Sequence, residues 1–191
     1  MVAFSSSGIS AAVDRRIGGL QGIGVGDLNC DGYGDLGVAN LGSPSVWLGG
    51  SDWMGERVVM LATPSGSSGS FTTPGSAGDY DGDGCGDIAV GDPGYASGDG
   101  RVSVYFGRSD ILPRSTLNYS LPIEPPDPRT GDGGGATNDF GSVAAADVNN
   151  DGRADLLVNA VNTGAGGRVY VYLGNASRRV TTPPLVLRGS S

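Results

Sequence analysis

The sequence predicts an all-β fold built from repeated small sheets, and three observations support this prediction. The 191 residues include 36 Gly and 11 Pro, a composition that favours many tight turns and few helices. The apolar residues are grouped in short runs at repeated offsets, which a disordered chain has no reason to keep. A nine-residue acidic pattern occurs three times, and one of these apolar runs follows each copy directly.

The acidic pattern reads D-x-[DN]-x-D-G-x-x-D and occupies Asp27–Asp35, Asp79–Asp87 and Asp147–Asp155. Oxygen atoms at loop positions 1, 3 and 5, with Gly at position 6 for the sharp turn, wrap a chain around calcium, a hard cation that accepts about six to eight oxygens. Position 7 varies, as expected for a residue that contributes only its backbone carbonyl, and the Asp at position 9 closes the ring. We therefore expect one calcium ion per repeat. The candidate ligands are Asp27, Asn29, Asp31, Tyr33 and Asp35; Asp79, Asp81, Asp83, Cys85 and Asp87; and Asp147, Asn149, Asp151, Arg153 and Asp155.

An EF-hand is the main alternative for such loops, and the sequence argues against it. An EF-hand carries a Glu at position 12 and a helix on each side, but position 12 is Val38, Val90 and Val158 in the three copies. The residues around these valines form short apolar runs typical of buried strands. The loops are therefore predicted to join strand to strand.

Each repeat is predicted to contain four antiparallel strands, of which the second, third and fourth are visible as apolar runs. In chain order these runs are Leu36–Ala39, Val46–Gly49 and Arg57–Leu61; Ile88–Gly91, Arg101–Gly107 and Leu117–Leu121; and Leu156–Val158, Arg168–Gly174 and Leu185–Leu187. Four short strands per repeat are the signature of a β-propeller blade.

The third strands of the three repeats can be aligned on their final glycines. Alternation along a strand then places Val46, Val104 and Val171 on one face of the sheets and Trp47, Tyr105 and Tyr172 on the other. Both faces are predicted to be covered, as in a blade between two others.

The whole chain, residues 1–191, is predicted to be a single propeller unit of three blades. The expected blade boundaries are 20–68, 69–133 and 134–191.

Two segments fall outside the repeated pattern. In the first 19 residues, Val2–Phe4 is a candidate strand and Ala11–Arg16 a candidate turn of helix. A Pro/Gly-rich insertion at 122–135 is predicted to be a surface loop without strands, either a partner contact or a tolerated excursion.

The net charge of −8 is mostly explained by the acidic loops, because they hold half of the 20 acidic side chains. Bound calcium would neutralise much of this charge. Nucleic acid is not an expected partner, since no basic stripe supplies phosphate contacts. All 12 basic residues are Arg and there is no His, so no imidazole can act as base, acid or ligand.

Cys30 and Cys85 both lie in acidic loops. They form either a bridge between neighbouring loops, if the protein is secreted, or two small buried thiols. No transmembrane span is predicted. The start MVAFSSSGIS lacks the regions of a signal peptide, so we expect either a removed leader or a longer parent protein.

The third repeat resembles a known family. Phe140–Asp147, the acidic loop, Asp155–Val158 and Gly167–Tyr172 are similar to an FG-GAP repeat, the blade of integrin α-chain propellers and their bacterial relatives. Repeat two keeps Val90–Pro93 where the family has V-G-A-P. The resemblance covers residues 20–191.

The other repeats depart from the family at the blade edge. Repeat two has Thr72–Thr73 in place of Phe-Gly, and repeat one has Leu20–Gln21 there and Asn40–Leu41 in place of Ala-Pro. These departures leave the loop residues intact. The resemblance implies calcium on the loop positions and a closed ring of seven blades. Because three blades cannot close a ring, we expect either a homodimer that closes a six-bladed ring or a piece of a longer propeller.

The predicted function is a non-catalytic, extracellular, calcium-stabilised binding or adhesion module whose protein or glycan ligand is unknown. One alternative is a lectin-like carbohydrate binder that uses Trp47, Trp53, Tyr95 or Tyr105 as stacking faces, and another is an accessory domain of a secreted enzyme. Catalysis by the chain itself is not expected, because an acyl-transfer triad is unavailable without His and the carboxylates are committed to metal.

Calcium is expected to staple the hairpin between the first two strands of each repeat rather than to keep an open position for an acidic ligand. Loop 2 has four carboxylates against three in each of the others. It is therefore predicted to bind calcium most tightly.

Overall fold

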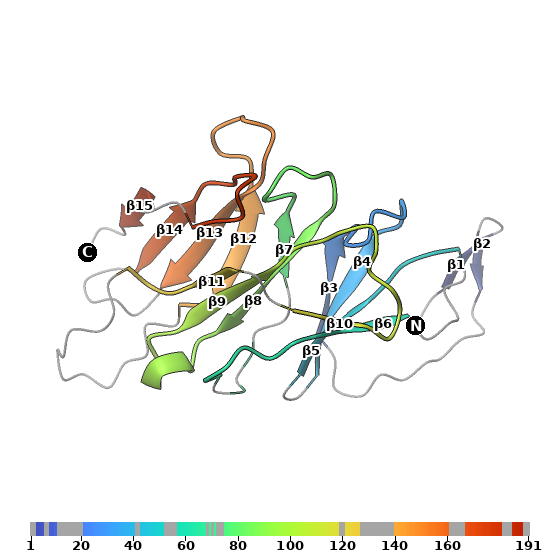
Figure 1. The fold of residues 1–191 in the computed structure, drawn as a ribbon, viewed down its shortest axis with the longest axis horizontal. Helices are drawn as coiled ribbons and strands as arrows, with labels where there is room; N and C mark the ends of the chain where they lie inside the picture. The colour runs from blue at the N-terminus through green and yellow to red at the C-terminus, as the bar shows by residue number, and fades with distance from the viewer. Residues whose placement is uncertain are drawn as a thin grey trace.

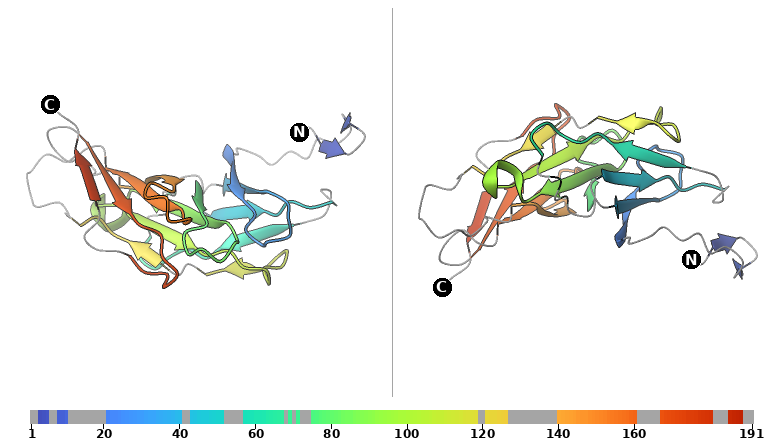
Figure 2. Two further views of the ribbon diagram at one scale, coloured as in Figure 1. Left: turned by 90° about the horizontal axis from the view of Figure 1, so that it is seen from above. Right: turned by 90° about the horizontal axis from the view of Figure 1, so that it is seen from below.

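The structure, a computed structural model, describes residues 3–5, 8–10, 21–40, 43–51, 57–67, 69, 71, 75–118, 121–126, 140–160, 167–180 and 185–188. Almost all regular structure in these ranges is β-strand, apart from a short 3-10 helix at Tyr95–Ser97. The predicted all-β class is therefore confirmed. Three larger sheets follow one another along the molecule in chain order and do not close into a barrel within these ranges (Figures 1 and 2).

Sheet 1 has five strands in the order β10-β6-β5-β4-β3. They are β3 (Gln21–Gly26), β4 (Asp35–Asn40), β5 (Ser43–Trp47), β6 (Val58–Leu61) and β10 (Thr116–Leu117). The first four pair antiparallel, whereas β10 pairs parallel with β6.

Sheet 2 is antiparallel with the order β11-β9-β8-β7. Its strands are β7 (Gly75–Gly78), β8 (Asp87–Asp92), β9 (Arg101–Tyr105) and β11 (Leu121–Ile123).

Sheet 3 is antiparallel with the order β12-β13-β14-β15. Its strands are β12 (Ser142–Ala146), β13 (Asp155–Ala160), β14 (Arg168–Tyr172) and β15 (Leu185–Arg188).

A small separate hairpin pairs β1 (Ala3–Ser5) with β2 (Gly8–Ser10). It overlaps the candidate strand Val2–Phe4, although β2 was not predicted. The candidate helical turn Ala11–Arg16 lies outside the described residues.

The expected fourth strand of repeat two, Leu117–Leu121, is wrong as a single strand. Its beginning belongs to β10 on the edge of sheet 1, while its end begins β11 on the edge of sheet 2. The apolar residues of this run indicate burial, but they do not show that its two ends pair with strands of different sheets. The prediction that 122–135 is free of strands is wrong at Pro122 and Ile123, because Pro122 pairs with Ser103 on an edge strand, where a missing N–H is tolerated. Residues 127–135 lie outside the described residues.

Two apolar layers hold the sheets together. Ile88, Val90 and Tyr105 pack against the apolar side chains of sheet 1. Val102, Val104 and Phe106 point the other way and pack with the apolar side chains of sheet 3. Successive residues of a strand thus face different neighbours, as the alternation predicted.

The predicted columns of the third strands are buried on both faces: Val46, Val104 and Val171 on one, and Trp47, Tyr105 and Tyr172 on the other. The next position differs between repeats. Leu48 and Phe106 are buried, but Leu173 on sheet 3 is 38% exposed.

A glycine follows each third strand because the chain passes close to other backbone there. A Cβ on Gly107 would lie 2.7 Å from the Leu28 carbonyl oxygen and would also collide with the Gly86 carbonyl oxygen. A Cβ on Gly174 would meet the carbonyl oxygens of Tyr80 and Ala154 in the same way. Both contacts join the end of one sheet to the acidic loop of the preceding sheet.

Replacing Gly107 by Ala is expected to lower the free energy of unfolding by about 1–3 kcal/mol, because rigid backbone oxygens cannot make room for a methyl group. Gly34→Ala is the matched control, since a Cβ there meets nothing within 4 Å, and it should change stability by less than about 0.5 kcal/mol. Urea denaturation of both variants measures the difference. Equal effects would contradict the close approach.

Candidate metal centres

Each acidic loop connects the first and second strands of its sheet. Loop 1 (27–35) joins β3 to β4, loop 2 (79–87) joins β7 to β8, and loop 3 (147–155) joins β12 to β13. The predicted strand-to-strand connection is confirmed, and no helix flanks any of the three loops.

The glycine at position 6 is required by the backbone of each loop. Gly32, Gly84 and Gly152 have φ values of 85°, 92° and 86°, a region that side chains avoid. This use of Gly was predicted from the sequence.

Position 4 is also left-handed in all three loops, at Cys30, Gly82 and Asn150. Sequence reasoning missed this feature, although Gly and Asn are the residues that adopt that conformation most readily.

The first Asp of each loop is the point around which the backbone turns. In loop 1, the Asp31 amide donates to Asp27 Oδ1 at 3.0 Å and the Gly32 amide to Asp27 Oδ2 at 2.8 Å. Asp79 and Asp147 accept the corresponding amides of loops 2 and 3. The loops therefore have one shared shape, set by their own carboxylates.

The Asp at position 9 is buried and ties its loop to the end of the third strand. Asp87 Oδ2 accepts the Tyr80 amide and Asp87 Oδ1 the Gly107 amide, both at 2.8 Å. Asp35 and Asp155 accept the equivalent pairs of amides. This structural role was not foreseen, because it depends on a glycine more than a dozen residues further along the chain.

Burial affects the ionisation of these aspartates. Loss of solvation raises the pKa of Asp87 to about 7, against the effect of its two backbone hydrogen bonds and with a further contribution from Asp81 and Asp83. Burial also raises the pKa of Asp35. A cation beside these carboxylates would favour their charged forms.

Oxygen atoms in two of the loops fit a hard cation. In loop 2, carboxylate oxygens of Asp79, Asp81 and Asp87 all lie within 4.8 Å of one another. In loop 1, Asn29 Oδ1 is buried and accepts no hydrogen bond from the part of the chain that the structure describes. Such converging acceptors are the ligand type that calcium prefers.

The three carboxylates that converge, Asp79, Asp81 and Asp87, all belong to loop 2. Among the described residues, no converging group combines acidic side chains of two different loops. Among the position-7 residues, Tyr33 is exposed, Cys85 is buried and Arg153 is half-buried. Asn29 and Asn149 each donate through Nδ2 to the Asp at position 5 of their loop, at 3.1 and 3.0 Å.

Successive loops are interlocked by their backbones. The Gly86 amide of loop 2 donates to the Asp27 carbonyl of loop 1 at 2.7 Å, and the Ala154 amide of loop 3 donates to the Asp79 carbonyl of loop 2 at 3.0 Å. The same loop position donates and the same position accepts in both cases, so the contact repeats with the sheets.

The region that contains interlocked loops 2 and 3 is similar to a known protein family. A family model described as an FG-GAP-like repeat matches residues 79–158, from the first Asp of loop 2 to the strand after loop 3. Residues 79–158 are therefore similar to an FG-GAP-like repeat. This confirms the resemblance found in the sequence.

Three curated relatives are similar to part of the chain, and each bears the name phosphatidylinositol-glycan-specific phospholipase D. The mouse protein is 35% identical over 120 residues, the rat protein 34% over 116 and the bovine protein 35% over 118. In each case the match covers 56% of this chain. The chain spans only 13–14% of the length of these relatives.

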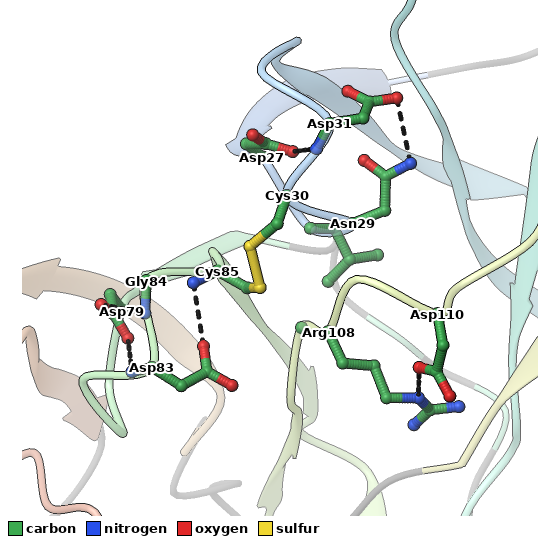
Figure 3. Close-up of a disulfide and its surroundings, with 12 residues drawn as sticks. Asp27, Asn29, Cys30, Asp31, Asp79, Asp83, Gly84, Cys85, Arg108 and Asp110 are labelled. Carbon is green, nitrogen blue, oxygen red and sulfur yellow. Dashed lines mark hydrogen bonds and ion pairs between the residues drawn. A yellow bond between two sulfur atoms is a disulfide. The ribbon is translucent and has the colours of Figure 1, made fainter.

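A disulfide joins the FG-GAP-like repeat to loop 1 (Figure 3). Cys30 at position 4 of loop 1 is bonded to Cys85 at position 7 of loop 2, with Cα atoms 5.2 Å apart. The alternative of two buried thiols is therefore wrong. The pairing could not be decided from the sequence, because the two cysteines occupy different loop positions and only the interlock brings them together.

Arginine side chains approach a carboxylate in every loop. Arg57 Nη2 lies 3.1 Å from Asp31 Oδ2, and Arg153 Nη1 lies 4.0 Å from Asp151 Oδ2. In loop 2, the cation comes from the next sheet: Arg178 of sheet 3 pairs with Asp81 and Asp83. No sequence signal identified these partners, since two of the three lie far from their loop in the chain.

No helix in the described residues combines the length and apolar character needed to cross a membrane.

Replacing both cysteines by Ser is expected to lower the free energy of unfolding by about 2–4 kcal/mol, because the bridge closes a large loop in the unfolded chain. The two residues are 55 positions apart. Guanidinium denaturation under oxidising and reducing conditions measures the loss. Reductant should destabilise the unmodified protein by the same amount and leave the double variant unaffected. An unmodified protein that is indifferent to reductant would contradict the bridge.

Proposed function

We propose that this chain is a calcium-stabilised, non-catalytic segment of a β-propeller and serves as an accessory module of a larger extracellular protein. The observation that carries the proposal is the interlock of three equivalent acidic loops, each placed against the loop of the neighbouring sheet. Metal bound in such loops would stiffen each hairpin and, through the interlock, its contact with the next.

The calcium ligands in this proposal are the oxygens at positions 1, 3, 5, 7 and 9 of each loop. Bound calcium would supply the positive charge that offsets repulsion between the clustered carboxylates. The chain already holds these groups in place, because backbone amides bind the first Asp and the ninth Asp of every loop. Ligands fixed in this way lose little freedom when a cation binds.

Residues at loop position 2 support the view that the propeller continues beyond sheet 3. Leu28 is fully buried between sheets 1 and 2, and Tyr80 is fully buried with side chains of sheet 3. Their counterpart Val148 in loop 3 is 50% exposed. Leu185 and Leu187 on β15 are also exposed, at 62% and 53%. A further sheet of the same kind would cover this face, either from a longer chain or from a second copy in a six-bladed homodimer.

The disulfide and the relatives support an extracellular accessory role. Stable disulfides form in oxidising compartments outside the cytosol. The relatives are named as phospholipases, and the matched segment is a small part of their length. We therefore favour the accessory domain of a larger secreted protein over a free-standing adhesion module.

The carbohydrate-binding alternative loses most of its candidate stacking faces. Trp47 and Tyr105 are buried, and the Arg101 guanidinium covers the Tyr95 ring at 3.9 Å from its centroid. Trp53 lies outside the described residues. Two of the four proposed aromatics are therefore buried, and Tyr95 has one ring face covered by Arg101.

Calcium is expected to raise the thermal midpoint of the chelator-treated protein, since a ligand at a hundredfold excess over its Kd adds about 2.7 kcal/mol per site. Magnesium is the control cation, because it requires near-octahedral geometry and usually keeps several of its waters. The measurement is a melting curve combined with the solution mass at the same calcium concentration.

A midpoint that is equal in chelator, magnesium and calcium would contradict the calcium proposal. A monodisperse monomer at every calcium concentration would exclude the homodimer and leave the longer propeller.

A further inference from the structure

Loop 2 receives a cation from the neighbouring sheet of this same chain. Arg178 lies in the connection between β14 and β15 of sheet 3. Its Nε donates to Asp81 Oδ2 and its Nη2 donates to Asp83 Oδ2 at 3.1 Å. The Asp81 side chain is only 2% exposed, so this ion pair is partly shielded from water.

The guanidinium binds the carboxylate oxygens at positions 3 and 5 that accept no backbone amide of the loop. Asp81 Oδ1 accepts the Asp83 amide at 3.0 Å, and Asp83 Oδ1 accepts the Cys85 amide at 2.8 Å. The remaining oxygen of each carboxylate is the one bound to Arg178. Positions 3 and 5 of loop 2 therefore already hold a positive charge.

A turn stabilised by hydrogen bonds of the Asn175 side chain places Arg178 beside loop 2. Asn175 Oδ1 accepts the Arg179 amide at 3.2 Å and the Ser177 hydroxyl at 2.6 Å, while Asn175 Nδ2 donates to the Arg179 carbonyl at 2.7 Å. Arg178 itself has a φ of 54°, a left-handed conformation that non-glycine residues rarely adopt. Its guanidinium carbon also lies 4.8 Å from the centroid of the Phe106 ring, a favourable cation–π distance.

The counterpart of Arg178 in the preceding repeat is an apolar residue. When the repeats are aligned on Gly107 and Gly174, the residue at the position of Arg178 in the preceding repeat is Ile111. Ile111 is 4% exposed and packs in the apolar layer between sheets 1 and 2. The connection after Gly107 therefore has a buried apolar residue where the connection after Gly174 has Arg178.

We infer that Arg178 is an internal cation that holds sheet 3 on loop 2 when no metal is bound, and that calcium displaces its guanidinium from Asp81 and Asp83. This inference rests on the calcium binding proposed above. One positive charge about 5 Å from a divalent ion weakens binding on the order of tenfold even at the dielectric constant of water. Arg178 thus offsets the extra carboxylate of loop 2.

The test compares calcium titrations of the full chain with those of Arg178→Gln and Arg179→Gln. Both variants remove one charge from the same segment, but the Arg179 side chain is exposed and makes no ion pair among the described residues. Arg178→Gln is expected to tighten one calcium site about tenfold. Arg179→Gln should leave every site within about twofold, the expectation for a distant, screened charge.

A second measurement does not depend on a variant's folding. The Nε–H nuclear magnetic resonance signal of Arg178 in the unmodified protein, assigned by its loss in Arg178→Gln, should move on calcium addition in proportion to the occupancy of loop 2. A signal unchanged at saturation, or equal affinities in the unmodified protein and Arg178→Gln, overturns the inference and leaves the calcium proposal standing. Calcium binding by none of the three proteins overturns both.

Discussion

The backbone contact between successive acidic loops is the constraint on which the rest of the structure depends. Gly86 and Ala154 donate their amides to the first Asp of the preceding loop, and this fixes how far each sheet is rotated from the last. Gly107 and Gly174 after the third strands are required by the same close approach, because their missing Cβ atoms leave room for one carbonyl oxygen of their own sheet's loop and one of the preceding loop. The apolar layers then fill the space between sheets whose spacing is already set.

The interlock also brings the acidic side chains of successive loops close to one another. Each loop gathers its carboxylates around its own backbone amides, and the ninth Asp is buried behind them. Loss of solvation and the neighbouring carboxylates raise the pKa of Asp87 to about 7, and a cation beside it would favour the charged form. The arginines near Asp31, Asp81 and Asp151 offset part of the negative charge of the loops. A metal ion in each loop would offset more of it.

The sequence was sufficient where the physical cause is local. The strand-flanked loops and the left-handed glycines at position 6 follow from residue type and spacing alone. It was insufficient where partners are chosen by tertiary packing: the pairing of Cys30 with Cys85, the position of Arg178, and the placement of Thr116–Leu117 and Leu121–Ile123 in two different sheets. The ninth Asp was recognised as important but only as a ligand, because its bonds to the backbone depend on the return of the chain after the third strand.

Hydrogen exchange at the two interlocking amides tests the central claim most directly. The Gly86 and Ala154 amides should exchange far more slowly than the amide of Gly34, which occupies the same position in loop 1 and is exposed, and calcium should slow them further. Exchange of the Gly86 and Ala154 amides at the rate of the Gly34 amide, with or without calcium, would contradict the account.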